Sequence, residues 1–244
     1  QAQGLMITYW TQYYNLDGQK ARIEQAKLSY QSEQNRLAAG MSTQSRVLSA
    51  KESVSNAEAA LVTAESNLAS TKESLCLMLG GGYGADVEKA RVAALLHDCT
   101  KKLSMEEQLA LCEQYGIALD ALEKKALKLL HAKTGAALAR DVFGVDDEIY
   151  NAILWHTTGK PDMTVLEKVI YLADFIEPTR DFPGVDALRR TVWEDLDRGL
   201  LMGLEMTVEE MEEMGNPIHV NTLAARDYLK GKTNEGKAGS GQQL

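Results

Sequence analysis

Residues 5–79 contain no proline and follow the hydrophobic pattern of two long helices, with a break at AAGMST, residues 38–43. In the second helix, apolar residues alternate at spacings of three and four, which is the seam of a coiled coil. The seam positions are Val47, Ala50, Val54, Ala57, Leu61, Ala64, Leu68, Thr71, Leu75 and Met78, and Ile23, Ala26, Tyr30 and Leu37 continue it on the first helix. Gly40 can take the left-handed conformation that ends a helix. This pattern predicts an antiparallel hairpin with arms of roughly 50 Å, at about 1.5 Å per residue.

The pattern changes after residue 79. The stretch GGGYG, residues 80–84, lacks the Lys and Ser/Thr of a phosphate-binding P-loop and follows no strand, so it is predicted to be a junction. From there to about Lys230, helical patterns alternate with short polar loops, and no period-two pattern of a β-strand stands out. Residues 231–244 are of low complexity and are predicted to be a disordered tail. The expected fold class is all-α, with a long antiparallel coiled-coil hairpin followed by a helical bundle.

Composition narrows the classes of function. Hydrophobic residues make up 45% of the 244 residues and charged residues 25%, which is typical of a globular protein. The net charge of -9 repels nucleic acid and anionic membranes, so any phosphate site is expected to be a pocket rather than a basic surface. Three cysteines without CxxC spacing suggest neither disulfides nor a zinc knuckle and fit a reducing compartment. No apolar run approaches the length of a membrane span, and no signal peptide is recognised.

All four histidines of the chain lie after the glycine-rich stretch at residues 80–84. His97 in ALLHDC, His131 in KLLHAKTG and His156 in AILWHTTG follow apolar or helical stretches, and His219 lies in NPIHVNT. A single histidine on an apolar face is more often a hydrogen-bonded core residue than a ligand. Three such cases, together with Asp174 at the end of VIYLADFIEP, favour a shared cation, because burying an isolated carboxylate costs several kcal/mol.

Adjacent His97 and Asp98 diverge by about a hundred degrees on a helix, so both can reach one cluster only if it lies between their directions. Imidazole with carboxylate and no thiolate favours iron, manganese or a similar ion over structural zinc, and Cys99 is interpreted as a packing residue. Nearby basic residues could bind a polyphosphate, although each could also be a solvated helix end: Lys101, Lys102, Lys133, Lys160 and Arg180. The predicted reaction class is metal-assisted hydrolysis of a phosphate ester or anhydride.

The N-terminal pattern resembles one repeat of the TolC-type outer-membrane efflux proteins over about residues 5–80. The resemblance includes the G-x-x-T hairpin tip at Gly40 and Thr43 and a closing Leu-Gly. Arg46 departs from the acidic residue common in that family, and the strands of its membrane barrel are absent, so a generic coiled-coil hairpin stays an alternative. The resemblance implies a periplasmic or outer-membrane location and a hairpin that seeks helical partners or self-associates.

The second half, LLHD, LLH, WHTTG, LADFIEP-x-R and P-I-H-x-N-T, resembles the HD-domain superfamily and within it the YqeK-type symmetrical bis(5'-nucleosyl)-tetraphosphatases, over about residues 83–230. This resemblance implies an all-helical, cytoplasmic enzyme that uses a divalent metal, most often iron, to cleave diadenosine tetraphosphate into two ADP. The implied metal ligands are His97, Asp98 and Asp174, and the implied catalytic residues are His97, Asp98 and Lys101. The implied substrate-binding residues are Asp98, Lys101, His131, His156 and Arg180, with His219 and Thr222 from the segment 217–222.

One departure concerns the metal site. Family members carry a further metal-binding histidine on a helix some thirty residues upstream, whereas no histidine precedes His97 in this chain. The predicted organisation is therefore a hairpin fragment at 1–79, a junction at 80–84, an HD-domain phosphohydrolase lacking its first helix at 85–230, and a tail at 231–244. An HD enzyme acting on other nucleotides is less consistent with HTTG and IEP-x-R. A non-enzymatic coiled-coil module joined to an inactive HD remnant stays the alternative of a different class.

Overall fold

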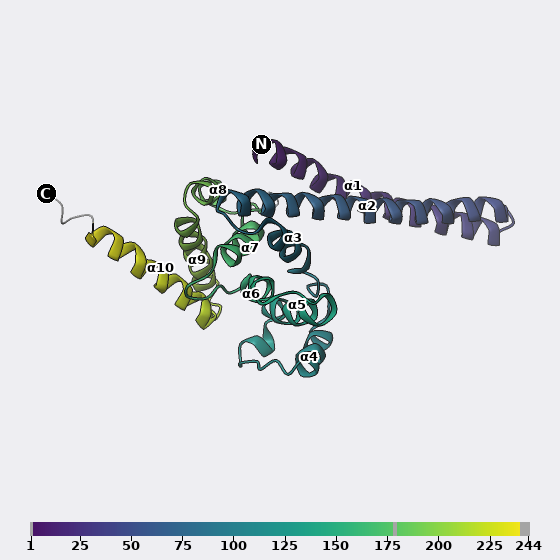
Figure 1. The fold of residues 1–244 in the computed structure, drawn as a ribbon. Coiled ribbons are helices and arrows are strands. Elements are labelled where there is room, and N and C mark those ends of the chain that lie inside the picture. The colour runs from purple at the N-terminus through teal and green to yellow at the C-terminus, as the bar shows by residue number, and fades with distance from the viewer. Residues whose placement is uncertain (1, 178–179, 240–244) are drawn as a thin grey trace. The chain divides into compact units, whose positions relative to one another are not determined.

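The computed structural model describes residues 2–177 and 180–239, which form ten α-helices and one 3₁₀ helix with no β-strand among them (Figure 1). The helices are α1 (Ala2–Ala38), α2 (Gln44–Gly82), α3 (Val87–Leu96), α4 (Met105–Gln114), η1 (Glu123–Lys125), α5 (Leu127–Phe143), α6 (Asp147–Trp155), α7 (Val165–Phe175), α8 (Val185–Glu194), α9 (Leu196–Glu213) and α10 (Val220–Gly239). The predicted all-α fold class is confirmed. The chain divides into two compact units, Gln1–Lys72 and Glu73–Leu244.

Unit 1 is a hairpin in which α1 packs against the first two thirds of α2. Gln12 lies opposite Thr71, with 2.6 Å between Oε1 and Oγ1, and Lys27 lies opposite Glu58, so the two helices are antiparallel. The predicted seam residues of this unit are all buried or half-buried, as a coiled-coil seam requires. The 37 residues of α1 correspond to about 55 Å at ~1.5 Å per residue. Gly40 has a φ of 75° in the connecting turn, as expected from its position after the helix.

The boundary between the units lies inside α2 and differs from the expected one at residue 79. Gly80, Gly81 and Gly82 form the last turn of α2 and are not a separate linker. A Cβ on Gly80 would lie 3.4 Å from the Cβ of Ala90, so the missing side chain lets α3 approach α2 closely. The chain turns only afterwards, at Gly84, which has a φ of 75°. The glycines thus permit close helix packing where the sequence suggested a flexible junction.

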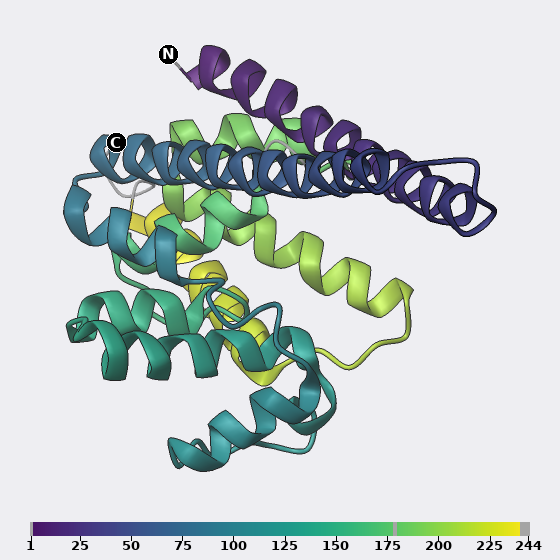
Figure 2. The same ribbon diagram turned by 90° about the vertical axis from the view of Figure 1, so that its right-hand side faces the viewer.

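The core of unit 2 is rich in alanine, which allows its helices to pack closely. Its buried members come from the end of α2 and from α3, α5, α6 and α7: Cys76, Ala90, Ala93, Ala94, Ala136, Ala139, Ile149, Ala152, Ile153, Leu166, Ile170 and Ala173. α5 and α6, which both contribute residues to this core, lie side by side (Figure 2). Because Cys76 belongs to the cluster and Leu79 is fully buried, the end of α2 supplies a packing helix to this unit.

The remaining helices, α8, α9 and α10, extend unit 2. α9 packs against α8, and α10 packs against α9. A disordered tail was predicted for residues 231–244, but residues 231–239 belong to the helix α10. Residues 240–244 lie outside the described part of the chain. No helix among the described residues is long and apolar enough to cross a membrane.

Candidate active site

The site is built where α3 ends. α3 stops at Leu96, and His97 is its C-cap, with its backbone N–H donating to the Ala93 carbonyl. The His97 Nδ1 lies 2.8 Å from the Ala94 carbonyl oxygen, which can only accept, so Nδ1 carries the proton and Nε2 presents a lone pair. That Nε2 lies 3.4 Å from Asp98 Oδ2 and 3.8 Å from Asp174 Oδ1. This is the tautomer that a metal-binding histidine uses.

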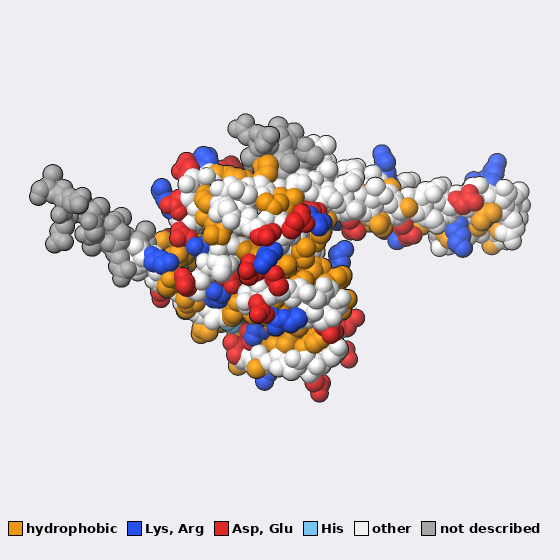
Figure 3. Space-filling view, viewed as in Figure 1, with side chains coloured by type: hydrophobic (Ala, Val, Ile, Leu, Met, Phe, Trp, Pro, Cys, Tyr) orange, Lys and Arg blue, Asp and Glu red, His pale blue; other side chains and the backbone are white. Residues whose placement is uncertain are grey.

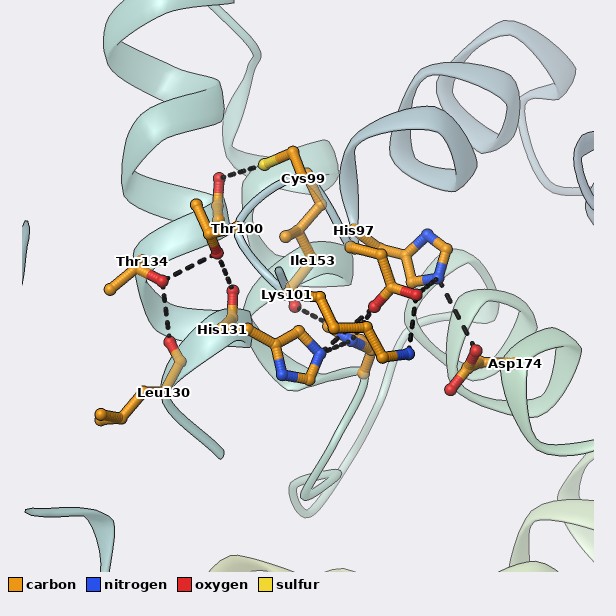
Figure 4. Close-up of polar contacts among 12 residues, drawn as sticks. His97, Cys99, Thr100, Lys101, Leu130, His131, Thr134, Ile153 and Asp174 are labelled. Atoms are coloured by element: carbon orange, nitrogen blue, oxygen red, sulfur yellow. Dashed lines mark hydrogen bonds and ion pairs between the residues drawn. The ribbon is translucent and has the colours of Figure 1, made fainter. Parts of the chain in front are cut away.

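Asp98 belongs to two groups that could hold a metal ion, and it contacts three residues that Figure 4 labels, His97, Lys101 and His131. Its Oδ1 lies 3.3 Å from Nε2 of His131 and 3.7 Å from Nε2 of His156, and its Oδ2 lies 2.8 Å from Nζ of Lys101. Burial raises the pKa of Asp98, but the hydrogen bond from His131 and the contacts with His156 and His97 lower it, and the net pKa lies far below its ordinary value. Asp98 is therefore a carboxylate at neutral pH, available to a cation.

His131 and His156 form a buried pair beside Asp98. Their Nε2 atoms are 3.0 Å apart, and Nδ1 of His156 lies 2.6 Å from the Ile153 carbonyl oxygen, to which it must donate. Nε2 of His156 is then an acceptor, so the His131 Nε2–H is the donor between the rings. Burial lowers the pKa of His156, because desolvation disfavours the charged imidazolium. His156 is thus held as a neutral imidazole next to an ionised carboxylate.

Asp174 and Arg180 form the part of the site that lies next to His97 and is supplied by the end of α7 and the segment after it. Asp174 lies in the last turn of α7, where the Arg180 guanidinium reaches it twice, from Nη2 to Oδ2 at 3.2 Å and from Nε to the backbone oxygen at 3.2 Å. The Arg180 side chain is 41% exposed, so part of the guanidinium faces solvent. The Asp174 carboxyl group and a cation that can also meet a phosphate therefore lie at the same edge.

A buried polar network, which the sequence pattern did not predict, holds the turn that carries His97 and Asp98. Thr100 Oγ1 lies 3.0 Å from the His131 carbonyl oxygen and 2.9 Å from Thr134 Oγ1. Gln108 is fully buried; its Nε2 donates to the Thr100 carbonyl and its Oε1 lies 3.0 Å from Thr134 Oγ1. The network ties this turn to the α5 backbone beside His131. A threonine directly after HDC was the one available signal, and it does not distinguish a buried from an exposed hydroxyl.

His219 and Thr222, which were predicted to bind substrate, contact other parts of the protein instead. His219 accepts a hydrogen bond from the Asn221 N–H at Nδ1, so its Nε2 carries a proton and faces Glu123 and Asp120 at 3.3 and 3.5 Å. Thr222 donates its hydroxyl proton to the Thr158 carbonyl at 2.9 Å. These contacts fix the start of α10 against η1 and against the turn that follows His156.

The other candidate residues differ in whether they reach the site. Lys133 pairs with Glu123 at 2.6 Å and Lys160 with Glu167 at 3.1 Å, so both are engaged in structural ion pairs, whereas Lys101 reaches the site. The Cys99 thiol lies 3.8 Å from the Gly135 carbonyl oxygen, in agreement with its interpretation as a packing residue. On the face drawn in Figure 3, acidic and basic side chains of unit 2 are interspersed.

Three groups among the described residues have ligand atoms close enough together to hold a metal ion: Asp98, His131 and His156; His97, Asp98 and Asp174; and Asp120, Glu123 and His219. The first two share Asp98. In the second, the His97 tautomer leaves Nε2 as an acceptor beside two carboxylates, so the donor set fits a divalent cation. In the third, Nε2 of His219 carries a proton and Glu123 is already paired with Lys133, so this group fits a metal poorly.

Comparison with known proteins matches both halves of the chain. Residues 73–179 match the HD domain family model, and residues 6–81 match the outer membrane efflux protein family model. The symmetrical bis(5'-nucleosyl)-tetraphosphatase of Halalkalibacterium halodurans is 40% identical over 148 residues, which are 60% of this chain and 79% of that protein. The enzyme of the same name from Bacillus subtilis is 38% identical over 148 residues, with the same coverage.

The chain belongs to the family of symmetrical bis(5'-nucleosyl)-tetraphosphatases. A crystal structure from Clostridium acetobutylicum, described as a predicted HD superfamily hydrolase involved in NAD metabolism, is 43% identical with a TM-score of 0.64. It covers 66% of this chain and 86% of the other. Both resemblances seen in the sequence are thus confirmed. The HD match begins at residue 73, not near residue 83, because the last turns of α2 pack into the core of this domain.

Proposed function

We propose that unit 2 hydrolyses dinucleoside tetraphosphates symmetrically, converting diadenosine tetraphosphate into two ADP, as the names of its relatives indicate for those proteins. The observation that carries the proposal is the convergence on Asp98. Three imidazoles and the Lys101 ammonium surround this single half-buried carboxylate, and Asp174 and Arg180 lie at the same site. Strongly perturbed ionisable groups that meet in this way are typical of catalytic sites.

His97, Asp98 and Asp174 would hold a divalent metal, for which iron is proposed, with manganese or a similar ion as the alternative. Neutral imidazole and carboxylate oxygens suit these ions, and no cysteine belongs to the group. When bound, such an ion supplies a water molecule of lowered pKa and offsets charge on a phosphoryl oxygen. The Nδ1–H bond of His97 to Ala94 keeps Nε2 as the acceptor that this role requires.

The protein's own donors would hold the polyphosphate. Lys101 Nζ and the Arg180 guanidinium each form one ion pair with a site carboxylate and retain further N–H donors for phosphate oxygens. For His219 and Thr222, the contacts with η1 and with Thr158 support a role in fixing the surrounding loops more than a direct phosphate contact.

The test is to incubate the full chain with diadenosine tetraphosphate and iron(II) or manganese(II) and to separate the products by chromatography. The proposal predicts ADP as the single nucleotide product, formed only with metal. Equal amounts of ATP and AMP would show asymmetric cleavage and contradict the proposed substrate chemistry. No nucleotide product with either metal would favour the non-enzymatic alternative, which the absence of a histidine before His97 keeps under consideration.

The location and partners follow from the two matches and are also proposals. The HD half is proposed to act in the cytoplasm, where its substrate class is expected, and the hairpin to contact helical partners or a second copy.

A further inference from the structure

Arg189 on α8 is a buried arginine whose side chain is committed to hydrogen bonds. Nε donates to the Ile176 carbonyl at 3.1 Å, and Nη2 donates to the carbonyls of Glu177 and Arg180, both at 2.9 Å. Nη1 pairs with Asp186 at 2.9 Å. The next residue, Arg190, is exposed. The sequence LRR therefore contains one solvent-facing arginine and one that acts as a backbone clamp.

The three carbonyls bound by Arg189 belong to the segment that leaves α7. Ile176 caps α7, and Glu177 and Arg180 lie beyond it, so none of these three carbonyls is bonded within the helix and each needs another donor. A guanidinium presents its N–H groups in a fixed planar fork, so one arginine can fix several carbonyls in a defined arrangement. Ile176 is itself buried, which keeps water from competing at the start of this segment.

The clamped segment places Arg180. Its N–H donates to the Glu177 carbonyl at 2.9 Å, so the backbone of Arg180 is bound at both its N–H and its C=O. From this position the Arg180 side chain reaches Asp174, at Oδ2 and at the backbone oxygen. Arg189 is thus linked by hydrogen bonds to the backbone of Arg180, and the guanidinium of Arg180 is linked to the Asp174 carboxylate.

We propose that Arg189 is a positioning residue that fixes the Arg180 guanidinium beside Asp174, and so sets where a phosphate of the substrate is held. Arg189 acts through Arg180 and does not itself contact the substrate. The catalytic part of this inference rests on the proposed function, whereas the placement of Arg180 does not.

The kinetic test compares Arg189→Lys with Arg190→Lys. Lysine keeps the positive charge but loses the fork that joins three carbonyls. A displacement of the phosphate-binding group costs up to about 100-fold, so Arg189→Lys is expected to lower kcat/KM by up to about 100-fold, mainly through KM. Arg190→Lys should change it less than about twofold, because neighbouring exposed charges contribute little. In an Arg180→Ala background, Arg189→Lys should add almost no further loss, because the residue it positions is gone.

The structural test needs no activity. In a ¹⁵N spectrum of arginine Nε–H groups, the signal lost on Arg180→Lys identifies Arg180, whose Nε–H is bound to the Asp174 carbonyl. Arg189→Lys should shift that signal toward the position of exposed arginines, and Arg190→Lys should leave it in place. If Arg189→Lys does not give helical protein by circular dichroism, Asp186→Asn replaces it, and the same but smaller shift is expected.

An unchanged Arg180 signal in the folded Arg189 or Asp186 variant would overturn the proposal. So would an undiminished effect of Arg189→Lys in the Arg180→Ala background. If the wild-type chain forms no ADP but the signal shifts as expected, the proposed function fails and the positioning of Arg180 by Arg189 stands.

Discussion

His156 provides a residue-scale prediction about pH. Burial lowers its pKa in the folded state, so below pH ~6.5, the ordinary value of histidine, the unfolded state binds a proton that the folded state resists. Its contribution to stability is therefore fully present above that pH and is lost as the pH falls. For the metal-free chain, urea unfolding should show stability decreasing from pH 7 to pH 5, and His156→Gln should reduce this slope. An identical slope in the variant would contradict the assignment of a buried, neutral His156.

Sequence context identified the ionisable residues of the site but not the residues that orient them. His97, Asp98 and Asp174 could be recognised because each interrupts or ends an apolar run, where an ionisable side chain needs a physical reason. Arg189, Thr100 and Gln108 could not be recognised, because such residues on an amphipathic helix or in a turn look the same in sequence whether they are buried or solvated. Their burial depends on which helix packs over them.

At the scale of the elements, the helix ends carry the chemistry and the small residues permit the packing. α3, α6 and α7 each end beside the site, at His97, His156 and Asp174. The 3-4 periodicity predicted the hairpin and the helical second half, because periodicity reflects which face is buried. It could not predict that Gly80–Gly82 continue α2, since glycine is read as a breaker unless the neighbouring helix that requires it is known.

Two glycines of α9 allow the packing of this helix to be tested. A Cβ on Gly199 would lie 2.6 Å from Val192 Cγ2 and 2.9 Å from Val192 Cα, whereas a Cβ on Gly203 would meet its nearest atom, in Phe175, at 3.6 Å. Gly199→Ala is therefore expected to destabilise the protein by about 1–3 kcal/mol through overpacking. Gly203→Ala should be neutral or stabilising by up to ~1 kcal/mol, because alanine favours a helix.

Urea unfolding of the two variants, followed by circular dichroism, measures the difference. Equal stability of Gly199→Ala and Gly203→Ala would show that α8 and α9 do not pack as closely at Val192 as described.

At the scale of the whole molecule, the chain combines two segments with different relatives. Residues 6–81 match the outer membrane efflux protein model and residues 73–179 match the HD domain model, so the two matches overlap in the last turns of α2. The same helix that completes the hairpin seam also supplies Cys76 to the core of unit 2. A boundary drawn from composition at the glycines missed this, because the apolar seam of α2 serves a coiled coil and a globular core without any change of spacing.

One metal-dependent centre around Asp98 is proposed to perform the hydrolysis. This can be tested by the rate of ADP release from diadenosine tetraphosphate by the chelator-treated full chain, titrated with manganese(II), in the wild type and in Asp98→Asn. The wild-type rate should rise from zero to saturation with added metal, and the Asp98→Asn rate should be lower by at least about 10³-fold at every metal concentration, because the shared carboxylate is lost. A wild-type rate that does not depend on metal, or an Asp98→Asn rate close to that of the wild type, would rule out such a centre.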